Sequence, residues 1–459
     1  MRATWSKLGF GAAKCAGSPE QRAALQAALA GGINVVDTGV SFKDGSSERM
    51  VGEELRRAPH DLARSVTVVS KVGYWKEPAE GTTKQPPGAL RLLPGVMYSL
   101  HPDFMARELR SSANRLGRVP SLYMVHNPES YVSCVVAREQ EKLGKQMGED
   151  GVPDAALLSD AREETYAALD ALFEVLEQCS AAGSVGGYGV CSHGLSSPPS
   201  DPLHLDVERI LAAARAAARR HSEGTGGGAD AGVGSLAAVQ LPGNLVETLG
   251  VEGGAAAAAA AAGVRVMLTR PLSVMLTTAV VSDGLQLISS LDRRGEPPQD
   301  YMDVCREVIE HFTYPPPEGR EPTQEEIETM QGCQFMQQLV QDMNQQLGSF
   351  ATYEHLQQEL AHAIIPMINA KFDELDATSV KHLQAFLDRY GDMVTYNCAE
   401  RLRDAILAAH PDGGMEPAPG DTWAQHSLRW LQARPHVDTV LVGMHQPRYV
   451  QDALAVLQR

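Results

Sequence analysis

Short apolar runs alternate with longer amphipathic stretches along most of the 459-residue chain. A short apolar run bounded by turn residues is typical of a buried strand, and apolar positions that recur every three or four residues are typical of a helix packed on a core. Eight strands are predicted in this way, over residues 8–11, 33–38, 66–72, 121–126, 187–192, 236–241, 264–269 and 437–442.

Amphipathic helices are predicted between these strands, over residues 19–30, 47–57, 102–116, 164–182, 207–221 and 422–433. The sixth helix has a poor pattern, and a last helix is predicted over 447–458. Strands that alternate with helices indicate parallel βα units, and eight of each is the count of an α/β protein with a (β/α)₈ TIM barrel. The alternative, a doubly wound open sheet, would carry a Gly-rich phosphate loop after the first strand. Gly9-Phe10-Gly11 lacks the third glycine at the required spacing, so the barrel is preferred.

Three segments depart from a compact barrel. Residues 223–235 are Gly-rich and predict a surface loop, and residues 128–162 predict a long loop of the kind that covers barrel mouths. The largest of the three segments, residues 273–420, lies between the seventh strand and its helix, and its pattern predicts a helical insertion. The chain is therefore expected to hold a barrel over 1–272 and 421–459 and an insertion over 273–420.

Within the insertion, Thr323-Gln324-Glu325-Glu326 has the pattern of a capping box at the start of a helix. Apolar residues follow on one helical face, at Ile327, Met330, Met336, Leu339, Val340, Met343 and Leu347. Further helices are predicted over 353–365 and 378–390. An E-x-x-H step, Glu359 and His362, lies in the first of these and has no second copy, which favours a solvated helix face over a di-iron site.

The composition excludes some classes of function. The formal net charge is −17, which opposes non-specific binding to nucleic acid or to an anionic membrane. No apolar run reaches about eighteen residues, so a membrane span is not expected. The seven cysteines are scattered without a C-x-x-C pair, which indicates a reduced protein with no zinc cluster and no other metal site. The segment before the first strand is too short for a signal peptide, so a cytoplasmic location is the default expectation.

An ordered series of short motifs lies at the predicted strand ends. The series consists of Asp37-Thr38 with Gly45-Ser46-Ser47-Glu48, Val69-Ser70-Lys71, Val125-His126-Asn127-Pro128, Gly189-Val190-Cys191-Ser192-His193, Val239-Gln240 with Asn244-Leu245, Arg270-Pro271-Leu272, and Val442-Gly443-Met444. Each motif is weak by itself, but the series in this order resembles the aldo-keto reductase family. The resemblance covers most of the chain outside the insertion.

The resemblance implies a known chemistry. In that family NAD(P)H delivers a hydride to a carbonyl carbon, and a tyrosine supplies the proton that the oxygen needs. A lysine paired with a carboxylate lowers the pKa of that tyrosine, and a histidine orients the carbonyl. By position, Asp37, Lys71 and His126 take three of these roles. The fourth position holds Phe42, which has no hydroxyl and cannot act as a general acid.

The pairing of Lys71 with Asp37 is also expected from the residues alone. Lys71 inside an apolar strand would be costly unless it is paired, so a buried pair with Asp37 is expected, either as a site or as a structural relic. His126 alone would be read as a core histidine, and only its place in the series makes it a substrate-facing candidate. Ser41 and Tyr74 are weak candidates to replace the missing acid, because geometry must be met before pKa matters.

The positions that bind the dinucleotide in the family are also partly altered. The resemblance assigns Ser192 and Gln240 to the nicotinamide carboxamide, and places His193 where the family has a partner asparagine. Thr269 takes the position of the ring that stacks on nicotinamide. His445 takes that of the basic residue near the 2′-phosphate, which Arg448 could replace. Arg270 and Gly443 complete the predicted cofactor site, and NADP bound at a weakened site is the cofactor expected.

Two functions follow as alternatives. The first is an NAD(P)(H)-dependent oxidoreductase homologue acting on a small-molecule carbonyl substrate, with carbonyl reduction impaired by the loss of the tyrosine. The second is a non-catalytic pseudoenzyme, a scaffold or dinucleotide-sensing subunit that binds a protein partner through residues 273–420. No nucleic-acid or membrane partner is expected.

Overall fold

The computed structural model describes residues 4–77, 84–143, 154–224, 232–277, 282–293, 295–345 and 376–457. The chain forms two compact units, each with its own internal contacts. The barrel unit comprises residues 1–271 and 425–459, and the insertion unit comprises residues 272–424. Each unit is described by itself below.

Eight parallel strands close the barrel, in the order β1-β13-β10-β9-β8-β7-β3-β2. The strands are β1 (Leu8–Gly11), β2 (Val35–Asp37), β3 (Thr67–Val72), β7 (Leu122–His126), β8 (Tyr188–Cys191), β9 (Leu236–Pro242), β10 (Arg265–Thr269) and β13 (Thr439–Gly443). Closure is made by β1, where Phe10 is in register with Val442 on one side and with Val36 on the other. The predicted (β/α)₈ barrel is confirmed.

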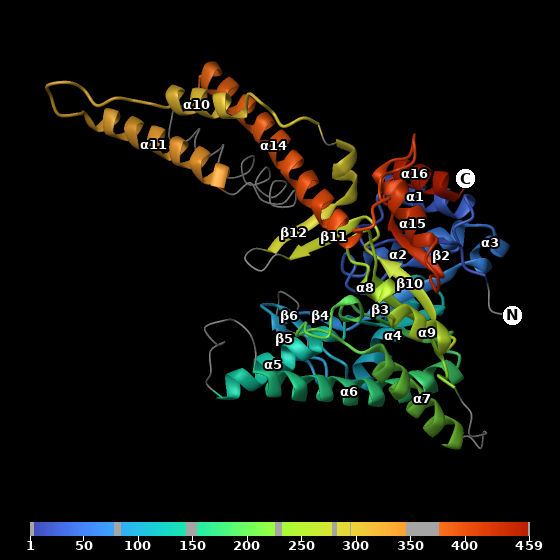
Figure 1. The fold of residues 1–459 in the computed structure, drawn as a ribbon. Helices are drawn as coiled ribbons and strands as arrows, with labels where there is room; N and C mark the ends of the chain where they lie inside the picture. The colour runs from blue at the N-terminus through green and yellow to red at the C-terminus, as the bar shows by residue number, and fades with distance from the viewer. Residues whose placement is uncertain are drawn as a thin grey trace. The chain divides into compact units, whose positions relative to one another are not determined.

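Helices follow the barrel strands, as the sequence pattern predicts (Figure 1). They are α1 (Pro19–Ala30), α2 (Ser46–Arg57), α3 (His60–Ser65), α4 (Pro102–Leu116), α5 (Glu129–Leu143), α6 (Ala155–Ala181), α7 (Val207–Gly224), α8 (Leu249–Glu252), α9 (Ala255–Ala261), α15 (Trp423–Gln432) and α16 (Pro447–Leu457). Local sequence fixes their ends: at α1, for example, Ser18 and Gln21 form a reciprocal capping box and Pro19 occupies the first turn.

Inward-facing side chains fill the barrel. Val35, Val69, Met124, Met267 and Leu441, from five different strands, belong to one buried cluster. Near the carboxyl ends of the strands this apolar filling gives way to buried polar groups, among them Asp37, Lys71 and Gln240. Polar groups at this end of a (β/α)₈ barrel form its usual site.

The loop predicted over residues 128–162 is wrong. Helix α5 covers Glu129–Leu143 and α6 begins at Ala155, while residues 144–153 lie outside the described ranges. Val132, Val135 and Val136 are buried at helical spacing, and this signal was available in the sequence. The Gly-rich segment 223–235 also begins differently, since α7 continues to Gly224, and residues 225–231 are not described.

A small antiparallel sheet lies between β3 and α4 in the sequence and was not predicted. Its strands are β4 (Tyr74–Lys76), β5 (Leu90–Leu93) and β6 (Val96–Tyr98), in the order β4-β6-β5. Tyr74 pairs with Tyr98, and Trp75 pairs with Met97. This sheet brings Tyr74 beside the end of the barrel where the polar groups lie.

The insertion unit begins with a hairpin of β11 (Ser273–Thr277) and β12 (Ser282–Leu287), which the sequence pattern did not predict. A 3₁₀ helix, η2 (Ile288–Arg293), follows, and then α10 (Tyr301–His311), α11 (Gln324–Gln345) and α14 (Ala377–Ala409). The predicted capping box is present at α11, where Glu326 N–H donates to Thr323 Oγ1 at 3.3 Å and Thr323 N–H donates to Glu326 at 2.8 Å. The helix predicted over 353–365, with Glu359 and His362, lies outside the described residues.

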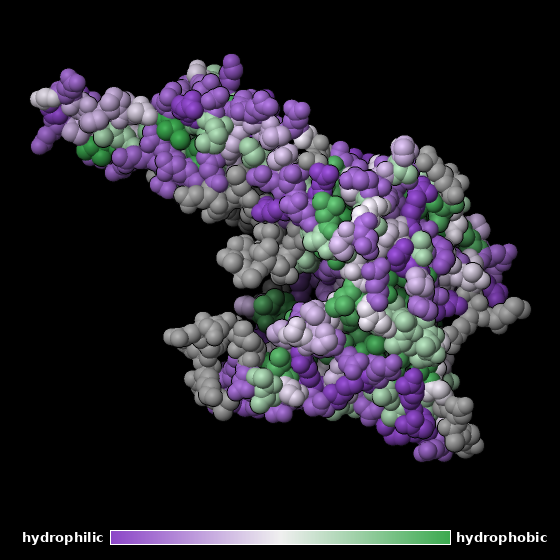
Figure 2. Space-filling model, viewed as in Figure 1, coloured by the Kyte–Doolittle hydropathy of each residue, from purple (hydrophilic) through white to green (hydrophobic). Residues whose placement is uncertain are grey.

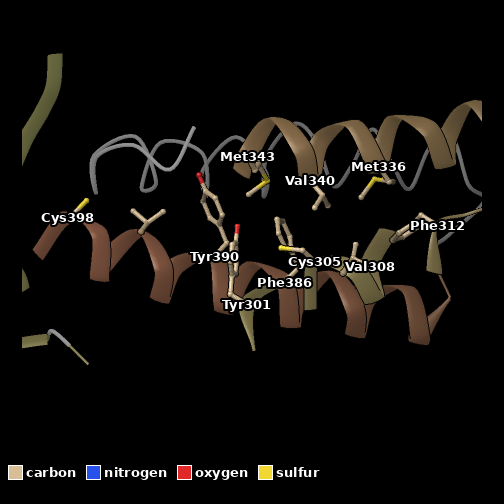
Figure 3. Packing of buried hydrophobic residues seen from close by; sticks show 11 residues of the cluster. Tyr301, Cys305, Val308, Phe312, Met336, Val340, Met343, Phe386, Tyr390 and Cys398 are labelled. Atoms are coloured by element: carbon tan, nitrogen blue, oxygen red, sulfur yellow. The ribbon is translucent and has the colours of Figure 1, made fainter. Parts of the chain in front are cut away.

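The insertion unit has a hydrophobic core of its own (Figure 3). Met336, Val340 and Met343 of α11 lie towards aromatic side chains of α10 and α14, which include Tyr301, Phe386 and Tyr390. The face of this unit seen in Figure 2 is mostly hydrophilic, with hydrophobic patches around α10 and α11. Of the helices described in either unit, none has the length and apolar character needed to cross a membrane.

Candidate active site

The buried ion pair predicted for Asp37 and Lys71 is present. Asp37 ends β2 and Lys71 lies near the end of β3, its neighbour in the barrel. Lys71 Nζ lies 2.6 Å from Asp37 Oδ1 and 2.5 Å from Asp37 Oδ2, and the two residues are 2% and 5% exposed. A lysine with this little solvent contact depends on its carboxylate partner to remain charged.

The third donor of Lys71 is also engaged. It donates to the carbonyl oxygen of Thr38 at 3.0 Å, so three acceptors surround an ammonium group that has three N–H donors. All three N–H donors of Lys71 are therefore directed at acceptors within the protein. The ring of Phe42 lies beside this lysine, with Nζ 4.7 Å from the ring centroid in a cation–π contact.

Phe42 and His126 face the same space. Phe42 lies in the turn between β2 and α2, and its ring centroid is 5.9 Å from that of His126 at the end of β7. Burial lowers the pKa of His126 well below its usual range, and the charge of Lys71 lowers it further. The imidazole is therefore neutral at pH 7, and its Nδ1 is buried with no partner among the described residues. A neutral imidazole of this kind can direct a hydrogen bond at a ligand.

Tyr74 lies next to His126 but is poorly arranged as a substitute acid. Its ring packs edge-on against that of His126 at 5.2 Å. Its hydroxyl lies 2.9 Å from Ser130 Oγ and accepts from Asn127 Nδ2 at 2.9 Å. Burial raises its pKa, which makes the phenol a weaker acid. Ser41, the other substitute considered, is exposed to solvent.

On the opposite side of the barrel mouth, Ser192 is bound to a carboxylate that the sequence did not single out. Ser192 Oγ donates to Glu129 Oε2 at 2.6 Å, and the His193 N–H donates to Glu129 Oε1 at 2.9 Å. Burial raises the pKa of Glu129. Because its proton is directed at Glu129, the Ser192 hydroxyl presents its lone pairs to any other partner. Glu129 directly follows His126-Asn127-Pro128, and a carboxylate at a strand end was the signal available for it.

Gln240 links the two sides of the mouth. Its Nε2 donates to Asp37 Oδ1 at 2.8 Å, while its Oε1 is buried and has no hydrogen-bond partner among the described residues. Thr269, at the end of β10, likewise has a buried Oγ1 with no described partner. Buried polar atoms are nearly always paired, so these two oxygens, which lack a partner among the described residues, are available to a ligand or an ordered water.

Arg270 and His193 are close enough to interact electrostatically. Arg270 adopts a left-handed backbone with φ of 54° directly after β10, and its guanidinium pairs with Glu247. His193 reaches the surface, yet the surrounding protein and the charge of Arg270 lower its pKa. A positive φ strains the backbone of a residue other than glycine, and such strained residues cluster at functional sites.

The remaining predicted cofactor residues lie around the end of β13. Gly443 is its last residue and is exposed, and Arg448 is exposed in the first turn of α16. The Arg448 guanidinium donates to Gln446 Oε1 at 2.7 Å and lies 4.9 Å from the Tyr449 ring centroid. Burial lowers the pKa of His445, with a further contribution from Lys14. Lys14, Glu20 and Arg448 all lie close enough to His445 to act on it electrostatically.

No group of three His, Cys, Asp or Glu side chains suited to a metal ion occurs within the described part of the chain. The groups described at the mouth are the Lys71 ammonium with its carboxylate partner, the neutral His126 imidazole and a set of hydrogen-bond acceptors. Phe42, the group between the first two, contributes an apolar ring.

Comparison with known families agrees with the barrel. The model of the Aldo/keto reductase family matches residues 7–197, the segment that holds the barrel strands β1, β2, β3, β7 and β8. Over these residues the chain is similar to the aldo-keto reductase family. No curated protein matches the sequence.

The solved structures found to be similar to this chain have low identities and low TM-scores. Aldo-keto reductase AKR11C1 from Bacillus halodurans, in its holo form, is 13% identical, with a TM-score of 0.45 over 99% of this chain and 87% of that one. An aldo-keto reductase from Klebsiella pneumoniae, in complex with NADP and acetate, is 16% identical, with a TM-score of 0.41 and coverage of 99% and 87%. Glycerol dehydrogenase AKR11B4 from Gluconobacter oxydans is 15% identical, with a TM-score of 0.44 and coverage of 99% and 88%. At these values no substrate or cofactor is transferred to this chain.

Proposed function

We propose that this protein is an aldo-keto reductase-type barrel that binds NADP(H) at a weakened site and has lost efficient carbonyl reduction. The observation that carries the proposal is the surroundings of Phe42. The lysine, carboxylate and histidine that would serve a catalytic tyrosine are assembled around it, and the phenol is absent. A positioned general acid contributes roughly 10²–10⁴ to a rate, so its absence accounts for a large loss.

The residues present fit the nicotinamide end of a dinucleotide in part. A carboxamide NH₂ group is a donor, and the unmet acceptor Gln240 Oε1 and the lone pairs of Ser192 Oγ are suited to hold it. When bound, NADPH supplies a hydride to a carbonyl carbon. Thr269 offers no ring to stack on the nicotinamide, which weakens binding by ~1 kcal/mol.

Two groups of the protein would contact a bound carbonyl ligand, His126 and Lys71. Neutral His126 donates or accepts a hydrogen bond and orients the ligand, and the Lys71 charge stabilises negative charge that develops on its oxygen. No group at position 42 hands over a proton. Transfer from water or from Tyr74, whose hydroxyl is bound to Ser130 and Asn127, would be slower.

A fluorescence titration of the full-length protein with NADPH and NADH tests the cofactor part. We expect NADPH to bind with a micromolar Kd, and Arg448→Gln to weaken NADPH about fivefold, ~1 kcal/mol for an exposed charge contact, while NADH changes little. Arg64→Gln, an exposed arginine on α3, is the matched control. Failure of both dinucleotides to bind at micromolar concentrations would contradict the proposal.

A scaffold is the second candidate, and the insertion unit favours it. This unit has an independent core of eleven buried residues, which includes Phe386 and Met336. It also exposes large apolar side chains, with Met302 63% and Val380 51% exposed. Exposed apolar surface on a stable unit is suited to a protein partner. Absence of dinucleotide binding in the titration would favour this candidate over the first.

A further inference from the structure

A cavity of about 400 Å³ lies in the barrel unit, beside the small sheet β4-β6-β5. Val40, Ser41 and Asp44, from the segment that follows β2, line it, as do Tyr74 and Trp75 of β4 and Val96 of β6. Ser41 and Asp44 flank Phe42 in the sequence, but Phe42, Lys71 and His126 are not among its lining residues. The cavity therefore adjoins the barrel mouth through Tyr74, whose ring packs against His126, but does not include Phe42, Lys71 or His126. Its size is that of a small-molecule site.

Its apolar part is built around Trp75. The indole is partly exposed, and its N–H has no hydrogen-bond partner within the described residues. Val40 and Val96 line the cavity with it. A flat aromatic surface with an unused donor at its edge suits a ligand that has a planar apolar body and an acceptor.

Its charged part has one cation without an ion-pair partner in the described structure. Lys76 is bound to Asp44 at 3.1 Å, and Arg115 is paired with Glu48. Arg49 makes only two contacts of 3.3 Å, to the carbonyl oxygen of Asp44 and to Ser46 Oγ. Its guanidinium therefore has donors to spare for an anion.

The balance of charge in the cavity also favours an anion. Three cations, Arg49, Lys76 and Arg115, line it, against two carboxylates, Asp44 and Glu108. Glu108 in turn lies 3.4 Å from Arg107. A cavity with an excess of cations is notable in a chain whose net charge is −17.

We infer that this cavity is a binding site for a small organic anion with a flat apolar body, such as an aryl or indolyl carboxylate. The apolar body packs against Trp75 and the valines, and the carboxylate is bound by the Arg49 guanidinium. The inference does not depend on the proposed function, because Phe42, Lys71 and His126 do not line the cavity and its anion is bound by Arg49.

Isothermal titration calorimetry of the full-length protein tests the site, with indole-3-acetate as the probe and its neutral amide, indole-3-acetamide, as the isostere. A charge-assisted hydrogen bond is worth about 1.5–3 kcal/mol, so we expect the acid to bind at least tenfold more tightly than the amide. Arg49→Gln should remove this preference, and Trp75→Leu should weaken both ligands. Arg64→Gln is the matched control and should change neither.

Phe42→Tyr separates this site from the mouth. We expect it to leave binding of the acid unchanged. The inference is overturned if the acid does not bind at millimolar concentration, if the amide binds equally well, or if Phe42→Tyr changes binding of the acid and Arg49→Gln does not. Because Arg49 is exposed, its replacement is not expected to affect folding, and this variant remains informative if Trp75→Leu fails to fold.

Discussion

The two sides of the barrel mouth differ in which hydrogen-bonding groups are already satisfied. On the side of β2 and β3, the three donors of Lys71 are all matched by Asp37 and Thr38, and the ring of Phe42 lies beside them. On the side of β8, β9 and β10, Gln240 Oε1 and Thr269 Oγ1 are buried acceptors without a described partner. The hydrogen-bonding groups of Lys71 are thus satisfied among the described residues, whereas these two oxygens have no described partner. On the proposed function, the difference means that the side without the general acid and the side that holds the dinucleotide can be tested separately.

The largest expected effect tests the satisfied side. Lys71→Met leaves the Asp37 carboxylate buried without its cation, which should lower the free energy of unfolding by about 3–5 kcal/mol. Urea denaturation measures this loss. Lys76→Met, which removes an exposed pair with Asp44 whose partners are both 70% exposed, is the control and should cost no more than about 1 kcal/mol. Equal losses in the two variants would mean that Asp37 and Lys71 are not a buried pair in solution.

The next effect concerns pH and the neutral His126. Its folded pKa is depressed, so below about pH 6.5 the unfolded chain binds a proton that the folded site does not. The free energy of unfolding should therefore fall as the pH falls below 6.5, by up to about 1.4 kcal/mol per pH unit from this group. His126→Gln should remove this part of the pH dependence. A variant that loses stability with falling pH as steeply as the wild type would contradict a neutral, buried imidazole.

The smallest effect tests the unsatisfied side. Thr269→Tyr supplies a ring at the position where the family stacks one on nicotinamide, and should tighten NADPH about fivefold, ~1 kcal/mol. Thr269→Val is the matched control, since it removes the hydroxyl without adding a ring and should not tighten NADPH. The Kd from fluorescence titration decides between them. An unchanged Kd in Thr269→Tyr would mean that the nicotinamide does not bind beside position 269.

Strand positions were predictable because apolar runs mark buried strands. The ends of β1, β3, β7 and β9 lie within one residue of the predicted ones. The structure of segment 128–162 was predicted wrongly. Its length suggested a loop, although Val132, Val135 and Val136 have helical spacing. Periodicity also gave no sign of the β4-β6-β5 sheet, whose strands are only three or four residues long.

Residue types in the site were predictable, but their partners were not. The pairing of Lys71 with Asp37 followed from the cost of an unpaired buried charge. The bond from Ser192 to Glu129 joins residues 63 positions apart, and only the closed barrel brings them together. The third bond of Lys71, to a backbone carbonyl, depends on the course of the chain after β2 and leaves no trace in residue identity.

The central claim is that the barrel binds NADPH but lacks the acid for carbonyl reduction. Its most direct test is single-turnover oxidation of bound NADPH by a generic aldehyde, in the wild type and in Phe42→Tyr. We predict that the wild type binds NADPH without measurable oxidation, and that Phe42→Tyr oxidises it at least about a hundredfold faster, the contribution of a positioned general acid. Wild-type oxidation at a rate comparable with that of Phe42→Tyr would contradict the claim, because position 42 would then not limit the reaction.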